Sequence, residues 1–143
     1  LEAQPRRRYV TRQAVARLHQ AGFRHPVLAA YHSCCAVCRL RHRSLLDAAH
    51  IIGDREVGGD PVVVNGLSLC KIHHAAFDHR VMGIRPDYVV EIRKDVLEEV
   101  DGPMLRYGLR AAHGQTLQLP RRKVDRPDPK RLERRYLEFR EVV

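Results

Sequence analysis

The sequence predicts a small α+β domain organised around a metal-binding cluster of cysteine and histidine. Helical and strand patterns are mixed along a chain of 143 residues, and two short segments, 35–38 and 70–73, each pair metal-binding residues across two intervening positions. This length is enough to bury one hydrophobic core, so we expect a single domain over 1–143. Its expected parts are a helical lead-in at 1–33, a core at 34–85 and a C-terminal α/β extension at 86–143.

The beginning of the chain has helix signals. Thr11 is an N-cap residue for a helix that runs to about Gln20, and Gly22 is expected to end it. Pro26, a residue favoured in the first turn, predicts a second short helix that runs to Tyr31.

The middle of the chain has strand and turn signals. Its apolar segments predict strands, and Asn65-Gly66 is a turn signal between them. In order, we expect a strand at 44–52, a loop at 53–61, a strand at 67–70 and a helix at 71–82 that Gly83 ends.

The last third is predicted to be mixed as well. We expect a strand at 88–93, a helix at 102–112, a strand at 116–119 and a helix to about Glu141. Asp128 is the N-cap of that last helix and Pro129 its first residue. Leu132, Tyr136 and Phe139 form an apolar stripe along it, which indicates core packing.

The charge balance narrows the range of partners. Lys and Arg number 26 against 17 Asp and Glu, a net charge of +9. A basic chain suits nucleic acid, although a solvated basic surface explains the charge equally well. The hydrophobic fraction of 44% excludes a disordered or low-complexity chain. No apolar run approaches the roughly 20 residues of a membrane-spanning helix, so we expect no membrane partner.

The cysteines predict a structural zinc site. Cys35, Cys38, Cys70 and His73 form a Cys3His set from two short knuckles, as tetrahedral zinc prefers. Cys34 is left as a spare thiol. Nothing in the sequence indicates secretion, so we expect a reducing, cytoplasmic compartment in which these thiols bind metal instead of forming disulfides.

Three polar residues lie beside this set at a distinctive spacing. His50 precedes Asn65 by 15 positions, and Asn65 precedes His74 by 9. Together with the segments CAVC at 35–38, LLDAAHI at 45–51, NGLSLC at 65–70 and HHAAFD at 73–78, this order resembles the HNH endonucleases, also called the His-Me finger or ββα-metal family. The segments look closest to the branch found in bacterial restriction endonucleases, including those that cut modified DNA.

The resemblance implies a fold and a reaction. It implies a ββα-metal core that hydrolyses DNA phosphodiester bonds with a second, catalytic divalent ion, Mg²⁺ or Mn²⁺ or another. It implies that His50 is the general base, that Asn65 holds the loop and orients the base, and that His74 binds the catalytic ion.

The sequence departs from the family at one position. Many members carry Asp or His directly before the general base, where this chain has Ala49. Asp47 lies on the same face of the predicted strand, and Asp78 lies one helical turn after His74. Both are therefore candidate ligands for the catalytic ion.

DNA is the expected partner. Arg55, Lys71 and Arg80 are candidate DNA contacts, although a solvated face is an equal interpretation for each. A homodimer is possible because a double-strand break usually needs two active sites. The chain begins at Leu1 and not at Met, so we expect a fragment of a longer protein whose specificity domain lies in the missing N-terminal part.

Two alternatives without catalysis stay open. A zinc-stabilised nucleic-acid-binding module would account for the charge and the knuckles. A zinc-scaffolded protein-interaction domain fits the charge less well. Both leave the spacing of His50, Asn65 and His74 without a reason.

Overall fold

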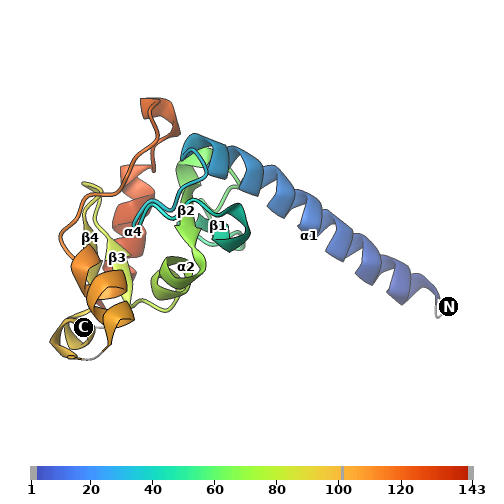
Figure 1. Ribbon diagram of the computed structural model, residues 1–143. Coiled ribbons are helices and arrows are strands. Elements are labelled where there is room, and N and C mark those ends of the chain that lie inside the picture. The colour runs from blue at the N-terminus through green and yellow to red at the C-terminus, as the bar shows by residue number, and fades with distance from the viewer. Residues whose placement is uncertain (1–2, 101, 142–143) are drawn as a thin grey trace.

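The computed structural model describes residues 3–100 and 102–141 and confirms the α+β class (Figure 1). A long helix comes first, a strand–strand–helix unit follows, and a small hairpin and a final helix complete the body. The elements are α1 (Ala3–Ala30), β1 (Leu46–His50), β2 (Gly66–Cys70), α2 (Lys71–Asp78), β3 (Met82–Ile84), β4 (Val90–Ile92), α3 (Lys94–Glu98) and α4 (Pro129–Arg140), with helical turns at Arg43–Leu45, Val63–Asn65, Met104–Leu109, Arg110–Ala112 and Lys123–Asp125.

Two antiparallel strand pairs organise the described residues. β1 pairs with β2 in a register that sets Leu46 opposite Cys70 and His50 opposite Gly66. β3 pairs with β4. Because α2 begins at Lys71, directly after β2, the segment β1–β2–α2 forms one continuous unit. Both predicted strands of this unit are confirmed, with β1 shorter than expected at each end.

The prediction of two helices before residue 31 is wrong, because α1 is a single helix that passes through Gly22 and contains Pro26. A glycine inside a helix costs only about 1 kcal/mol, which tertiary packing readily offsets. Here Phe23, Val27 and Leu28 are buried against the β1–β2 unit. The N-terminal half of α1 projects away from the body (Figure 1).

The predicted helix 71–82 is too long, because α2 ends at Asp78. Arg80 adopts a left-handed conformation, with φ of 58°. The Arg80 amide donates to the Phe77 carbonyl at 3.3 Å and the Val81 amide to the Ala76 carbonyl at 2.9 Å, the bond pattern of a Schellman cap. An arginine therefore occupies the position where glycine is usual, and Gly83 lies within β3 instead of ending a helix.

The C-terminal part follows the predicted order with two corrections. The expected strand at 116–119 is reduced to a single bridge between Val89 and Thr116, and α3 was not expected. The helix α4 is confirmed, with the Asp128 carboxylate accepting from the Lys130 amide at 3.2 Å. Leu132 and Phe139 of its apolar stripe are buried, and the Tyr136 hydroxyl donates to Glu91 at 2.8 Å.

In the portion of the chain that the structure describes, no helix combines the length and the apolar character needed to cross a membrane.

Two glycine substitutions test this packing. A Cβ at Gly83 would overlap the ring of Phe139, where α4 lies on β3, whereas a Cβ at Gly22 meets nothing within 4 Å. We expect Gly83→Ala to lower the free energy of unfolding by about 1–3 kcal/mol through overpacking. We expect Gly22→Ala to raise it by about 0.5–1 kcal/mol through helix propensity. Denaturant unfolding measures both, and equal signs for the two alanines would contradict this account.

Candidate active site and metal cluster

The four predicted zinc ligands lie together in the structure. One ligand atom from each of Cys35, Cys38, Cys70 and His73 falls within 4.8 Å of the others. The sulfurs of Cys38 and Cys70 are 3.8 Å apart, and His73 Nδ1 is 3.2 Å from the Cys70 sulfur. Three sulfurs and one imidazole nitrogen in this arrangement form a Cys3His group that can hold a zinc ion.

Neighbouring groups prepare the cluster for a metal. His73 Nε2 donates to the Gly108 carbonyl at 2.6 Å, which leaves Nδ1 as the nitrogen directed at the sulfurs. Hydrogen bonds from Cys35 and Cys38 lower the pKa of the Cys70 thiol, while hydrogen bonds with Cys35 and Cys70 raise the pKa of the Cys38 thiol. In the metal-free cluster the thiolate is therefore favoured at Cys70 and not at Cys38. Cys34 lies outside the cluster, and its thiol is 3.5 Å from the His32 carbonyl.

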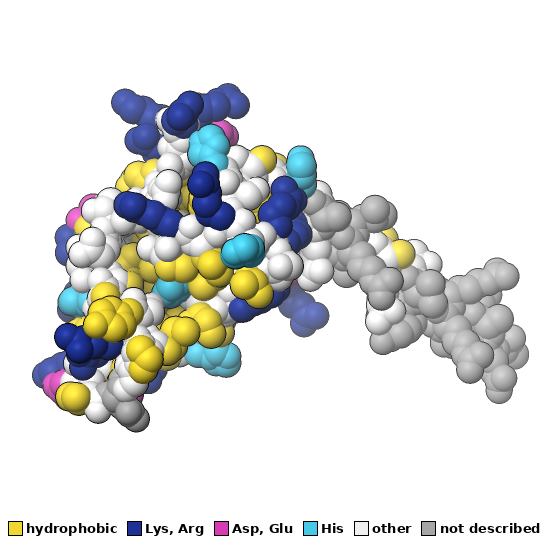
Figure 2. Space-filling model, in the orientation of Figure 1, with side chains coloured by type: hydrophobic (Ala, Val, Ile, Leu, Met, Phe, Trp, Pro, Cys, Tyr) yellow, Lys and Arg dark blue, Asp and Glu magenta, His cyan; other side chains and the backbone are white. Residues whose placement is uncertain are grey.

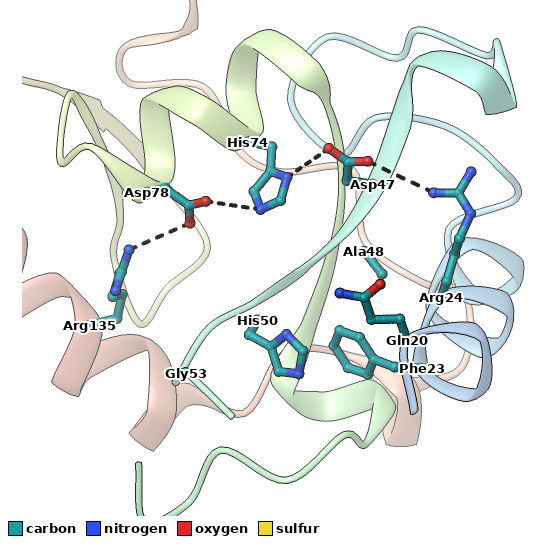
Figure 3. A pocket seen from close by; sticks show the side chains of 10 residues that line it. All are labelled: Gln20, Phe23, Arg24, Asp47, Ala48, His50, Gly53, His74, Asp78 and Arg135. Carbon is teal, nitrogen blue, oxygen red and sulfur yellow. Dashed lines mark hydrogen bonds and ion pairs between the residues drawn. The ribbon is translucent and has the colours of Figure 1, made fainter. Parts of the chain in front are cut away.

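Four elements surround a cavity of about 610 Å³ that none of the cluster residues lines (Figure 3). The helix α1 forms one wall and β1 another, while α2 and α4 complete it. Four of the predicted functional residues, His50, His74, Asp47 and Asp78, line the cavity. Residues from α1 and α4 that the sequence did not single out also line it, namely Gln20, Phe23, Arg24 and Arg135.

His74 is held between the two candidate carboxylates. Its Nδ1 lies 2.8 Å from Asp47 Oδ2, and its Nε2 lies 3.2 Å from Asp78 Oδ2. The hydrogen bond to Asp78 and then that to Asp47 raise the pKa of His74 to about 8, against the opposing effect of burial. Two carboxylates therefore converge on one imidazole, as the i,i+4 spacing within α2 and the register of β1 against β2 allow.

Asp47, His74 and Asp78 form a row of charges, and an arginine lies beside the carboxylate at each end (Figure 3). Arg24 lies 4.0 Å from Asp47, and Arg135 lies 3.9 Å from Asp78. The Lys71 ammonium also donates to Asp47. Although partial burial of Asp47 alone would raise its pKa, hydrogen bonds from His74 and Lys71 hold the pKa of this carboxyl below its ordinary value.

His50 ends β1 and packs against an aromatic ring. Its ring stacks on Phe23 with centroids 4.1 Å apart and an interplanar angle of 20°. Its Nε2 is buried and has no hydrogen-bond partner among the described residues. Burial lowers the pKa of His50 below its ordinary value of 6.5, so this imidazole is neutral at neutral pH.

Asn65 holds the loop that follows His50. Its side-chain oxygen accepts from the Ile52 amide at 2.9 Å, and its amide nitrogen donates to the carbonyls of Ile52 and Asp60 at 3.0 Å each. Asn65 is fully buried, so it ties both ends of the 52–60 loop to the start of β2.

The three candidate DNA contacts have different surroundings. Arg55 is exposed on the loop after β1. Lys71 is engaged with Asp47 at the cavity. Arg80 caps α2, and its carbonyl accepts a 3.5 Å bond from the Arg93 guanidinium.

The sequence patterns around the unpredicted cavity residues do not show that these residues belong to a site. Phe23 belongs to an apolar helical face and Arg135 to a charged helix, patterns that alone indicate a core and a solvated surface. Only tertiary packing brings them to the cavity. Arg135 lies over the Phe77 ring at 4.8 Å and donates to the Phe77 carbonyl at 3.2 Å.

Two comparisons with known proteins found similarities to this chain. Residues 35–85 match the HNH endonuclease family, which confirms the resemblance over that segment. Among solved structures, a "Modification dependent TagI restriction endonuclease" is similar over 80% of this chain, with a TM-score of 0.54 at 20% identity. At this identity the likeness shows the fold alone, and the chain spans 36% of that protein's length. No curated protein matches the sequence.

Metal analysis and two cysteine variants test the Cys3His cluster. We expect about one zinc per purified chain. Cys38→Ser should release it and lower the free energy of unfolding by several kcal/mol, because zinc binding contributes directly to folding. Cys34→Ser is the matched control, since this thiol neighbours the cluster without joining it. A folded Cys38→Ser protein with full zinc content and unchanged stability would contradict the assignment of this cluster as the zinc site.

Proposed function

We propose that this chain, whose residues 35–85 match the HNH endonuclease family, is a metal-dependent nuclease that hydrolyses DNA phosphodiester bonds. We further propose that it serves as the cleavage domain of a restriction enzyme of the modification-dependent kind. One observation carries the proposal: a neutral imidazole, His50, and an imidazole between two carboxylates, His74, line the same cavity. A base and a cation site side by side are what phosphodiester hydrolysis requires.

In this proposal His50 is the general base. Its lowered pKa keeps the imidazole unprotonated and ready to accept a proton from an attacking water. Because Nε2 is shielded, we propose that the proton is taken at Nδ1. Asn65 supports this role from a distance, by holding the loop that begins beyond His50.

The row of charges around His74 suits a divalent cation. A raised pKa means that the metal-free imidazole is protonated on both nitrogens, with Nδ1 facing Asp47 and Nε2 facing Asp78. A cation that replaces the Nε2 proton meets the Asp78 carboxylate, while the Nδ1 proton stays with Asp47. When bound, such an ion supplies positive charge that stabilises the phosphate and the leaving oxygen.

The two carboxylates have different surroundings, which indicate different roles. The Asp47 side chain is 25% exposed and already paired with Lys71, whereas that of Asp78 is 52% exposed. We propose that His74 Nε2 and Asp78 hold the ion. Asp47 then accepts from the opposite ring nitrogen and orients the imidazole, as carboxylates behind metal-bound histidines do. At the position where many family members carry Asp or His, Ala49 is fully buried and offers no ligand. In this proposal, Asp47 and Asp78 supply the negative charge of the site instead.

Basic side chains outside the cavity support DNA as the substrate. Figure 2 shows Lys and Arg gathered on the loop that precedes α4 and protrudes from the body. Arg121, Arg122 and Lys123 are exposed there. Such residues bind the phosphate backbone without reading sequence.

We therefore propose that sequence specificity comes from another domain, N-terminal to this segment. We also propose that a second copy of this chain cuts the second DNA strand. We also propose a cytoplasmic location, where the cluster thiols stay reduced.

A zinc-stabilised nucleic-acid-binding module remains the second candidate. The Cys3His group and the basic loop favour it. It gives no reason for the two carboxylates on His74. Plasmid cleavage with Mg²⁺ or Mn²⁺, compared with the same reaction in EDTA, separates the two functions.

Replacement of the proposed base tests the chemistry. We expect His50→Ala to lower the cleavage rate by about 10²–10⁴-fold while DNA binding and the melting temperature are retained. His42→Ala is the control, because this histidine is exposed on the loop before β1. At saturating metal, the acid limb of the pH–rate profile should lie below pH 6.5, because neutral His50 persists down to its lowered pKa. A His50→Ala protein that cleaves at the wild-type rate would exclude His50 as the base.

Alanine variants of the two carboxylates test the metal site. We expect Asp78→Ala to raise the metal concentration for half-maximal cleavage more than Asp47→Ala does, because a ligand is lost and not an orienting group. Metal titrations of the cleavage rate measure this. A larger effect of Asp47→Ala would exchange the two roles. If neither variant changes the requirement while His74→Ala is inactive, His74 holds the ion without either carboxylate.

A further inference from the structure

We propose that Phe23 of α1 is a positioning residue for His50, and that its ring holds the imidazole in the orientation needed at the cavity. The proposal rests on the assignment of His50 as the base. Phe23 lies outside residues 35–85, so the family match does not include it. It lines the same cavity as His50 (Figure 3).

The contact between the two rings is close and nearly parallel. A centroid distance of 4.1 Å and an angle of 20° mean that one face of the imidazole is covered by the phenyl ring. Aromatic pairs at this distance contribute about 0.5–1.5 kcal/mol beyond the area that they bury. Rotation of His50 about its side-chain bonds would break this contact, so the stack favours one orientation.

The neighbouring strand leaves room for the ring. Gly66 lies directly opposite His50 in the β1–β2 register. A Cβ on Gly66 would overlap Val27 and come within 3.0 Å of Phe23. Because Gly66 has no side chain, α1 can pack close enough to the β1–β2 pair for the Phe23 ring to contact the imidazole.

The part of α1 that follows Phe23 is fixed to the β1–β2 unit. Arg24 donates to the carbonyls of Leu46 and Arg43, which ties α1 to the start of β1. One turn later, Val27 is fully buried. Phe23 itself is 2% exposed. A ring held in this way can orient its neighbour, whereas a mobile one could only cover it.

Three charged groups influence the charge of His50, but less than burial does. Asp54, His74 and Asp78 act on its charge, but burial has the largest effect and lowers its pKa. Phe23 contributes to that burial. Its removal should therefore admit water to the imidazole as well as release its orientation.

The decisive comparison is between Phe23→Leu and Val27→Ala. Both truncate buried α1 residues that pack over Gly66, but only Phe23 stacks on His50. We expect Phe23→Leu to lower kcat about 10-fold or more with KM changed little, because misplacement of a reacting group impairs the chemical step. Val27→Ala should lose stability but keep kcat. Equal kcat values for the two folded variants would overturn the proposal.

Nuclear magnetic resonance tests the contact without cleavage. In the wild-type protein, the ring protons of His50, identified by their loss in His50→Ala, should lie upfield of those of exposed histidines, because they stand over an aromatic face. Phe23→Leu should move them downfield, and Val27→Ala should not. Signals at ordinary positions in the wild type would overturn the stack even if Phe23→Leu does not fold. Wild-type cleavage by His50→Ala would instead overturn the assignment of the base, with these shifts unaffected.

Discussion

The register between β1 and β2 is the constraint on which the rest of this structure depends. It sets Leu46 opposite Cys70 at one end of the ladder and His50 opposite Gly66 at the other. The first end delivers Cys70 to the Cys3His cluster and to the start of α2, whose N-cap it is. The second end places His50 beside the only side-chain-free position of β2. A slip by one residue would turn every side chain of the strand to the other face and would break both ends together.

The cavity is completed by helices from both sides of the family-matched segment. The core unit supplies His50, His74 and the two carboxylates, but Arg24 comes from α1 and Arg135 from α4. These arginines lie at the outer ends of the row of charges, one beside each carboxylate (Figure 3). The flanking helices are therefore part of the electrostatics of the site and do more than cover the core.

The sequence predicted local features well and distant ones poorly. The cysteine knuckles, the Asp128 cap and the strands around His50 follow from short patterns, since neighbouring residues determine them. The helix end at Arg80 was missed because its left-handed cap uses a residue without the usual preference for that conformation. The break expected at Gly22 does not occur because burial of Phe23 and Val27 outweighs local propensity. The wall residues could not be predicted, since their roles exist only once helices far apart in the sequence meet.

The proline in α1 has a mechanical consequence. Pro26 has no amide hydrogen, so the helical bond to the Gly22 carbonyl is not made, and Gly22 adds freedom at the same turn. The missing helical bond and the glycine therefore lie where the projecting N-terminal half of α1 meets the half that packs on the sheet. A bend at this turn would change the direction of the projecting half and leave the packed half of α1 in place on the sheet.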